Sequence, residues 1–481
     1  MWTQRDQLQA YQFLRRRLVS ALQVGDANHP VSPSRRLVIG CALGAAAALL
    51  VTAGFGVYGF LRPGANTDWR KPGRVVIEKD TGAVYVMGAD GLLHPMLNYA
   101  SARLLAGGDG TATSQVSSKS LAGAPRGVPL GIPAAPSSLP PRDRLLAGPF
   151  TVCAQTAPGR PAGTPPVTTA LAGVSPAGTA VNPASALVVA GPDGVAYALV
   201  SGRRHRIVDQ ATAVALGYDA VRPLPVSAAW LNAVTAGPDL RLRTVDRVGA
   251  GGPRVGDRNT RVGQVLVVAN IGAGSRYYLV RADGLLAIGQ TEAALVLGNP
   301  ANRAAYPRGA AREIQVTAAD VAESQSATGG AADYPARLAP PVETPPDQVA
   351  ICATMDGDAT VIRLGASTGV PAGAAPIAAG GGARADAVFV PAGRAAVLRE
   401  RPAPQAALGA VYLLTDQGMR YPVPDGDALK ALGFGEVSPT PVPPSMLALF
   451  PTGPVLDPAA AQRPVPPDAA RPSADVGETT R

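Results

Sequence analysis

The chain is short of the residues on which large cores and most catalytic centres depend. Aromatic residues make up 5% of its 481 residues and charged residues 16%, and it has three histidines, three cysteines and four lysines. So few aromatic side chains suit several small units better than one compact core. Lysine and arginine form no long runs, which argues against a nucleic-acid-binding protein. The histidines and cysteines lie far apart in sequence, so we expect no metal cluster.

The sequence also lacks the motifs by which common enzymes bind phosphate or activate a nucleophile. A Walker A loop needs glycines placed before its lysine, and the nearest string, Ser118-Lys119-Ser120, lacks them. No Gly-x-Ser-x-Gly elbow with a suitable histidine occurs, and His29, His94 and His205 lack the spacing of metal ligands. We therefore expect no catalytic residues, no cofactor and no enzymatic activity.

A long uncharged run near the N-terminus predicts a membrane span. Residues 37–61, LVIGCALGAAAALLVTAGFGVYGFL, contain no charged side chain, and a bilayer core needs about 20 apolar residues as a helix. A cleaved secretory signal peptide is the alternative, but such a peptide normally starts nearer the N-terminus and has a shorter apolar region. We expect an uncleaved single-pass anchor.

The charge on either side of this run indicates its orientation. Residues 1–36 carry six arginines against two aspartates, and Arg35 and Arg36 adjoin the run. The positive-inside rule keeps this end in the cytoplasm, although Arg70, Lys71 and Arg74 beyond the run weaken the contrast. We expect residues 1–36 to form a cytoplasmic arm and the C-terminal region to lie on the extracytoplasmic, periplasmic side of the cell membrane.

The arm itself has an amphipathic pattern. Tyr11, Leu14, Leu18 and Leu22 recur at spacings of three and four, with three arginines between them, and Gly25 follows. This spacing predicts a helix with one apolar stripe. Such a helix either lies on anionic lipid headgroups or docks a cytoplasmic or membrane partner, and the sequence alone leaves both open.

Glycine and proline are abundant, with 55 and 48 residues, and many of the glycines follow one recurring pattern. An apolar strand is followed by a Gly-x-x-Tyr step, a second short strand, a turn glycine and a helix rich in Ala and Leu. The four steps are Gly82–Tyr85, Gly194–Tyr197, Gly274–Tyr277 and Gly409–Tyr412. Self-similarity of this kind indicates repeated small αβ units, hence an α+β protein with hairpin turns and helices closed by glycines such as Gly217, Gly298 and Gly433.

Two β-rich stretches do not fit the repeat, and each contains a cysteine. Cys153 and Cys352 lie in matched apolar strands, whereas Cys41 lies inside the predicted span. Outside the cytoplasm a lone pair of cysteines is expected to oxidise, so we predict a Cys153–Cys352 disulfide, with free buried thiols as the alternative. The two stretches would then form one central domain.

These patterns predict the following order of segments. They are the arm (1–36), the span (37–61), repeat 1 (62–112), the first part of the central domain (113–185), repeat 2 (186–245), repeat 3 (246–312), the second part of the central domain (313–400), repeat 4 (401–457) and a disordered Pro-rich tail (458–481).

Taken in order, these residues resemble the EccB family, a membrane component of type VII (ESX) secretion systems. The matching stretches are the arm QLQAYQFLRRRLVSALQVGD, the single span, RGVPLGIPAAPSSLPP at residues 126–141, the two exterior cysteines, and the Gly-Pro-x-Leu endings at residues 237–240 and 453–456.

The resemblance implies four αβ repeats around a disulfide-linked central domain. It also implies a structural subunit that assembles with the EccC-type ATPase, EccD and, in many systems, EccE, and that takes part in export of WXG100-type substrates. Some members carry an ATPase label, for which this sequence offers no motif. A second hypothesis is an envelope-binding protein, because the exterior carries a net charge of 9 − 4 = +5. A homo-oligomer and contact with cell wall are compatible with both.

Overall fold

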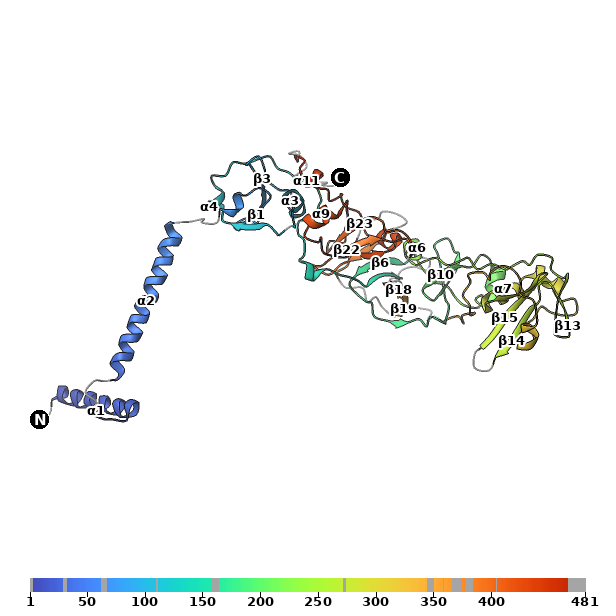
Figure 1. Ribbon diagram of the computed structural model, residues 1–481, viewed down its shortest axis with the longest axis horizontal. Coiled ribbons are helices and arrows are strands. Elements are labelled where there is room, and N and C mark those ends of the chain that lie inside the picture. The colour runs from blue at the N-terminus through green and yellow to red at the C-terminus, as the bar shows by residue number, and fades with distance from the viewer. Residues whose placement is uncertain are drawn as a thin grey trace, which may run out of the picture.

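The computed structural model is long and narrow, with two helices at one end followed by a row of small sheets (Figure 1). It describes residues 3–28, 33–61, 67–109, 111–156, 164–270, 274–343, 350–357, 359–365, 373–376, 384–403 and 405–465. Most of the predicted tail therefore lies outside the described residues.

The two N-terminal helices follow their local sequence signals. Helix α1 spans Gln4–Val24, begins where the Asp6 carboxylate accepts hydrogen bonds from the Thr3 amide and hydroxyl, and ends at Gly25 with φ 75°. Helix α2 spans Pro33–Leu61, and its segment Leu37–Tyr58 is long and apolar enough to cross a membrane. It stands alone, with no other element packed around its middle (Figure 1).

Four sheets of four strands share one topology. In each, the first three strands in sequence form antiparallel hairpins, and the fourth returns parallel to the first, which gives the spatial order third, second, first, fourth. The strands of the first sheet are β1 Val75–Glu78, β2 Val84–Met87, β3 Leu93–Pro95 and β4 Thr113–Val116. Those of the second are β8 Leu187–Ala190, β9 Ala196–Val200, β10 Arg203–Arg206 and β11 Leu224–Pro225.

The other two sheets lie further along the chain. The third contains β14 Val265–Asn270, β15 Gly274–Arg281, β16 Gly284–Ile288 and β17 Ile314–Gln315. The fourth contains β22 Ala395–Glu400, β23 Val411–Thr415, β24 Arg420–Val423 and β25 Thr440–Val442. A two-stranded ribbon, β12 Gly251–Val255 and β13 Arg258–Arg261, precedes the third sheet.

A helix joins the third strand to the fourth in every four-stranded sheet, and each such sheet with its helices is called a unit, numbered first to fourth along the chain. These helices are α3 Tyr99–Ala106, α5 Gln210–Leu216, α7 Gln290–Leu297 and α9 Gly426–Ala431. In three of them the side chain of an N-cap residue, Asn98, Asp209 or Asp425, accepts a backbone N–H from the first turn, which satisfies a donor that has no partner within the helix. A shorter helix follows the fourth strand: α4 Ser118–Leu121, α6 Ala228–Ala233, α8 Ala318–Ala322 and α10 Pro444–Leu447.

The predicted helix-ending glycines act in two ways. Gly217 and Gly433 have φ of 71° and 93°, as expected for residues that close a helix in a conformation glycine favours. Gly298 instead keeps a right-handed conformation at φ −70°. A Cβ there would lie 2.3 Å from the Cβ of Ala215, so this glycine is needed where α7 approaches α5.

A seven-stranded sheet forms the central domain from two distant chain segments. Its order is β20 Ala375–Pro376, β21 Ala387–Phe389, β6 Val167–Ala172, β5 Phe150–Gln155, β18 Ala350–Asp356, β19 Ala359–Gly365 and β7 Thr179–Ala180. Strands β5 and β18 pair antiparallel with Cys153 opposite Cys352, and the two side chains form a disulfide. The predicted bridge is confirmed.

Three predicted repeat borders do not coincide with the ends of the four-stranded sheets. Strand β4 lies beyond residue 112, β17 lies beyond residue 312, and β22 begins before residue 401. Strands β4 and β17 are the fourth strands of their sheets, and their partners lie more than 30 residues earlier. Strand β22 follows β21 of the central sheet after a short connection, but it pairs with β23.

The expected disordered tail begins later than predicted. Residues Pro458–Ala461 form α11, whose start is capped by Asp457 and whose Ala461 is fully buried. Beyond it the Val465 amide donates to the Pro129 carbonyl over 3.0 Å. These contacts with the first unit order a segment whose composition alone indicates disorder.

The chain runs out along the molecule and returns (Figure 1). In the first unit Arg103 donates to the carbonyls of Ala431 and Leu432 in the fourth, over 3.3 and 3.2 Å. A large core joins the central sheet to the second and fourth units, and within it the Trp230 indole donates to the Val152 carbonyl over 3.1 Å. Helices α5 and α7 join the second unit to the third.

Candidate functional site

Helix α1 of the N-terminal arm carries more exposed large hydrophobic side chains than any other described element except α2. Tyr11, Leu14, Leu18 and Leu22 all lie on α1 at helical spacing, and each is more than half exposed. Leu8 is equally exposed and lies three residues before Tyr11, so it extends the same stripe by almost one turn. Its spacing was readable in the sequence. An uncovered stripe of this length is typical of a surface that binds a partner or a lipid interface.

The charged residues of the arm do not form a separate face. Arg15, Arg16 and Arg17 are consecutive, so they point in three directions around the helix. The Arg17 guanidinium lies 5.7 Å from the centre of the Phe13 ring, away from the stripe. Cations therefore flank the apolar stripe, and the arm can present both kinds of contact at once.

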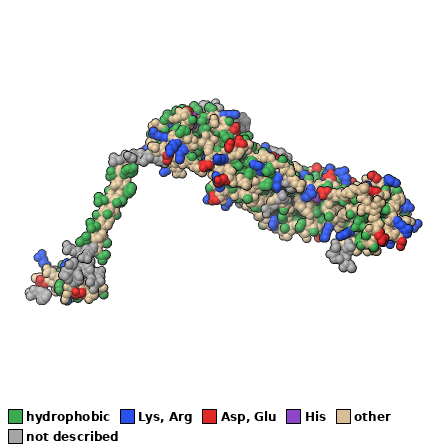
Figure 2. Space-filling model, in the orientation of Figure 1, with side chains coloured by type: hydrophobic (Ala, Val, Ile, Leu, Met, Phe, Trp, Pro, Cys, Tyr) green, Lys and Arg blue, Asp and Glu red, His purple; other side chains and the backbone are tan. Residues whose placement is uncertain are grey.

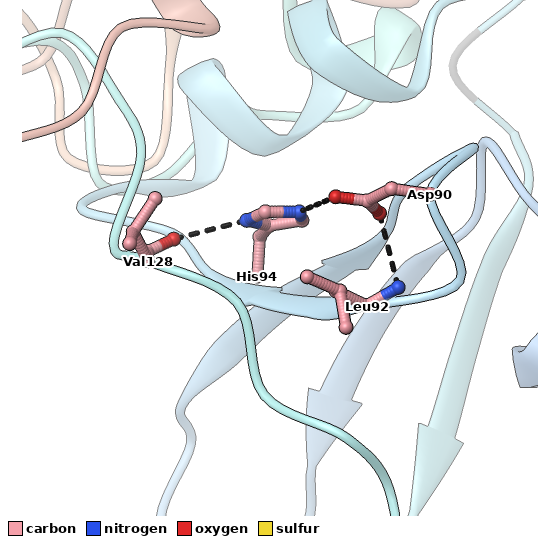
Figure 3. A network of polar contacts seen from close by, with 4 residues as sticks. All are labelled: Asp90, Leu92, His94 and Val128. Atoms are coloured by element: carbon pink, nitrogen blue, oxygen red, sulfur yellow. Dashed lines mark hydrogen bonds and ion pairs between the residues drawn. The ribbon is translucent and has the colours of Figure 1, made fainter.

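A polar network closes one edge of the first sheet (Figure 3). His94 on β3 contacts the Val128 carbonyl through Nδ1 and the Asp90 carboxylate through Nε2, each over 3.0 Å. Both partners offer an oxygen acceptor, so the ring is positioned between a backbone carbonyl and a carboxylate. The Leu92 amide and the His94 ring donate to Asp90, and these bonds lower the pKa of its carboxyl.

In three units an aromatic or imidazole ring on the third strand packs directly against a glycine of the segment that follows the unit. A Cβ on Gly127 would lie 2.3 Å from the His94 ring, and a Cβ on Gly237 would lie 2.2 Å from the His205 ring. In the fourth unit a Cβ on Gly453 would lie 2.4 Å from Tyr421. The His205 Nδ1 contacts the Pro238 carbonyl over 3.0 Å, and burial lowers the pKa of this ring. Two of the three histidines thus each pack against a glycine of the segment that follows their own unit.

The basic run at residues 203–206 is largely taken up by internal contacts. Arg204 donates to the Val234 carbonyl over 3.0 Å and lies over the Tyr197 ring, while Arg203 donates to the Ala236 carbonyl. Arg206 is exposed, and its backbone pairs with Tyr197 and accepts from the Leu240 amide over 2.7 Å. A solvated, structural strand therefore fits better than a site for an anionic partner.

The string nearest to a phosphate-binding loop already holds an anion of the protein itself. The Asp80 carboxylate accepts from the Ser118 amide over 2.9 Å and from its hydroxyl over 2.5 Å, at the start of the four-residue helix α4. These are the groups that a phosphate would need. Across the described residues, no three His, Cys, Asp or Glu side chains come close enough to hold a metal ion.

A buried ion pair joins the second unit to the third. Arg243 lies 2.5 Å from Glu292 of α7, whose side chain is almost fully buried and also accepts from the Ala332 amide over 3.2 Å. Burial raises the pKa of Glu292, while the positive charge of Arg243 opposes the shift. The pair fixes the connection between the units and is not open to a ligand.

Comparisons with known proteins agree along nearly the whole chain. A family model described as type VII secretion system ESX-1, transport TM domain B, matches residues 1–465. The ESX-3 secretion system ATPase EccB3 of Mycolicibacterium smegmatis is 29% identical over 482 residues, covering 94% of this chain and 89% of the relative. The ESX-2 secretion system ATPase EccB2 of Mycobacterium tuberculosis is 34% identical over 242 residues, covering 49% and 47%.

Solved structures give the same result. A chain of an intact ESX-5 inner membrane complex matches with a TM-score of 0.64 and 25% identity, covering 97% of this chain and 96% of that one. The EccB3 dimer from the ESX-3 core complex matches with a TM-score of 0.63 and 28% identity, covering 81% of this chain and all of the other. The chain therefore belongs to the EccB family of type VII secretion system membrane components.

Proposed function

We propose that this chain is a non-catalytic assembly subunit of a type VII secretion membrane complex that exports WXG100-type substrates. Family membership supports the complex. The observation that carries the assembly role is the exposed stripe of α1, which adjoins the helix suited to cross the membrane. A subunit that works through contacts needs such a surface, whereas an enzyme needs a site that binds a substrate.

In this proposal α1 lies in the cytoplasm, α2 spans the cell membrane, and residues from Thr67 onward lie outside the cytoplasm. The arginine-rich residues 1–36 support this orientation through the positive-inside rule. The Cys153–Cys352 disulfide also supports it, because disulfides persist in oxidising compartments.

We propose further that the four small sheets are copies of one repeated unit arranged around the disulfide-linked central sheet. Their common strand order supports this, as does the ring-beneath-glycine contact in three of them. In a repeat architecture each unit contacts mainly its neighbours, which suits an elongated subunit with contacts at several heights above the membrane.

The proposed partners are an EccC-type ATPase, EccD and EccE, together with a second copy of this chain. Related chains were solved within an ESX-5 inner membrane complex and as an EccB3 dimer, which supports a multi-subunit assembly. The arm is on the side where a cytoplasmic motor would lie, so we assign Tyr11, Leu14, Leu18 and Leu22 to partner docking.

The double variant Leu14→Glu with Leu18→Glu tests this assignment. Fully burying a leucine at an interface is worth roughly 1.5–3 kcal/mol, so two charges in the stripe should release the chain from its membrane partners and stop export. Gln9→Glu with Gln12→Glu is the matched control, because it adds the same charge to exposed positions away from the stripe. Co-purification and export should be lost in the first variant and retained in the control.

The opposite result would assign the arm to the membrane surface. Normal co-purification and normal export by the Leu14, Leu18 variant would show that assembly rests on α2 and the exterior. A chain that is absent from the membrane would be recognised by fractionation before either readout.

The ATPase in the names of the relatives is the alternative function. The chemistry of Ser118 speaks against it in this chain, because Asp80 already occupies the amide and hydroxyl that would face a phosphate. Phosphate and an ionised carboxylate would repel each other at this position.

A further inference from the structure

The short connection to α2 keeps the first unit close to the membrane. Helix α2 ends at Leu61 and the described chain resumes at Thr67, so the extended chain between these residues spans at most about 22 Å. Figure 1 shows α4 and the N-terminal end of this unit turned toward the end of α2. The surface around α4 is therefore the part of the exterior nearest to the lipid headgroups.

This surface carries most of the lysines in the protein. Three of the four, Lys71, Lys79 and Lys119, belong to the first unit, and all three are exposed. Arg70, also exposed, adjoins Lys71 at the end of the 3-10 helix η1, Asp68–Arg70. Elsewhere the chain uses arginine almost exclusively. A lysine ammonium is a compact, strongly hydrated charge on a flexible stem, which suits a mobile anionic surface better than a fixed internal contact.

The fold gathers these cations around one edge of the sheet. Trp69 of η1 is buried in the same small core as Val116 of β4 and Leu121 of α4, which places Arg70 and Lys71 beside β4, the strand that leads into α4. The Lys79 amide donates to the Val116 carbonyl over 2.9 Å, which places Lys79 beside the start of α4 and Lys119. Figure 2 shows Lys and Arg side chains over this end of the unit, next to the connection from α2.

The acidic groups of this edge are engaged within the unit. Asp68 lies 2.7 Å from Lys71, and the Asp80 carboxylate accepts two hydrogen bonds from Ser118. Glu78 is buried and accepts from the Thr81 and Tyr85 hydroxyls. Four exposed cations thus face two exposed carboxylates, of which Asp68 pairs with Lys71 and Asp80 with Ser118, so the edge keeps a net positive charge.

We propose that this edge, formed by Arg70, Lys71, Lys79 and Lys119, binds the anionic headgroups of the adjoining lipid leaflet and holds the first unit against the membrane. This rests on the proposed function only in that α2 spans the bilayer. Each lysine near an anionic surface strengthens binding by about five-fold. The same contact explains why cations follow the span on the side where the positive-inside rule expects few.

The test places the full-length chain in nanodiscs of phosphatidylcholine, with or without about 30% phosphatidylglycerol, and follows hydrogen exchange of residues 113–121. Exchange should slow by about five-fold or more with the anionic lipid, and high salt should reverse the effect because it screens exposed charges. The variant Lys71→Gln, Lys79→Gln, Lys119→Gln should abolish the dependence on lipid. The control Arg254→Gln, Arg258→Gln, Arg276→Gln removes the same charge at the far third unit and should leave it intact.

Equal exchange in both nanodiscs, or a lipid dependence that survives the triple lysine variant, would overturn the proposal. Slowing by a soluble acidic glycan but not by phosphatidylglycerol would also overturn it, and would assign the edge to an envelope polymer. Incorporation into nanodiscs reports on α2 separately, and no variant alters the arm. Failure here is therefore distinct from failure of the proposed docking role.

Discussion

At the scale of single residues, Glu292 is a buried ionisable group that makes stability depend on pH, because its side chain has almost no exposed surface. Its burial raises its pKa above the usual value of 4.5, and Arg243 opposes the shift. The folded chain then holds a proton that the unfolded chain releases, so this group's contribution to stability is lost as pH rises from about 4.5 through the raised value. Removing the cation should make that loss steeper.

Arg243→Ala should accordingly lower the free energy needed to open the junction between the second and third units by about 3 kcal/mol at pH 7. The change leaves a buried carboxylate without its partner. The loss should be smaller at pH 5, where Glu292 is more readily protonated. Hydrogen exchange of α7 amides at the two pH values measures both. Arg241→Ala, which removes an exposed cation paired with Asp239, is the control and should cost under about 1 kcal/mol. Equal losses of stability in the two variants would refute the role given to Arg243. A loss in Arg243→Ala that is the same at pH 5 and pH 7 would also refute it.

At the scale of elements, the units share one contact. A side chain of the third strand packs against the chain segment that follows the unit's last short helix. The bridges Leu93–Arg126 and Leu285–Ser326 are parallel, and they align His94 with Leu286 and Gly127 with Ala327. The third unit therefore has leucine and alanine where the first has a ring and glycine. Two neighbouring positions change together, which is expected when a Cβ and a ring compete for one space.

Gly127→Ala should therefore destabilise the first unit by about 1–3 kcal/mol, because its Cβ would overlap the His94 ring. Adding His94→Leu should restore part of the loss by reproducing the pair found in the third unit. Gly123→Ala is the control, since a Cβ there meets no atom within 4 Å. Exchange of β3 amides reports the change. No loss of stability in Gly127→Ala would contradict this packing account. A double variant that loses more stability than the sum of the two single variants would also contradict it.

Much of the secondary structure could be predicted from the sequence. The features that could not be predicted all depend on partners far away in the chain. The Gly-x-x-Tyr steps indicated the hairpins because both strands of a hairpin are local. Strands β4, β17 and β25 contain two to four residues each, and their hydrogen bonds go to strands far back in the chain. No local pattern identifies such strands. Leu8 was readable by its spacing, whereas the glycine contact at Gly298 depends on a neighbouring unit and was not.

At the scale of the whole molecule, the central sheet holds the outgoing and returning passes of the chain together. Strands β5 and β18 are 199 residues apart at their cysteines, and every strand of the second and third units lies between them. The disulfide therefore closes a loop that contains about half of the described chain beyond α2. Its main effect in the chain-entropy description is on the unfolded state.

Replacing both cysteines, Cys153→Ala with Cys352→Ala, should destabilise the central domain by about 2–5 kcal/mol. The arm and α2 are untouched, so membrane insertion should be normal. Chemical unfolding of the full chain in detergent, followed by exchange in β5 and β18, measures the loss. Peptide mapping of the native chain is the companion experiment, and finding both thiols alkylated without reduction would show that the mature protein lacks the bridge.

That this chain works by contact and not by catalysis is tested most directly by ATP hydrolysis of the purified full-length protein. Turnover should not exceed that of a matched preparation of Lys119→Ala, the lysine nearest to a phosphate-binding pattern. Any residual activity should survive substitutions in this chain, as activity from a co-purified motor would. Robust turnover that a single substitution in this chain abolishes, with the fold and the arm-dependent co-purification intact, would contradict the account and identify the subunit as an enzyme.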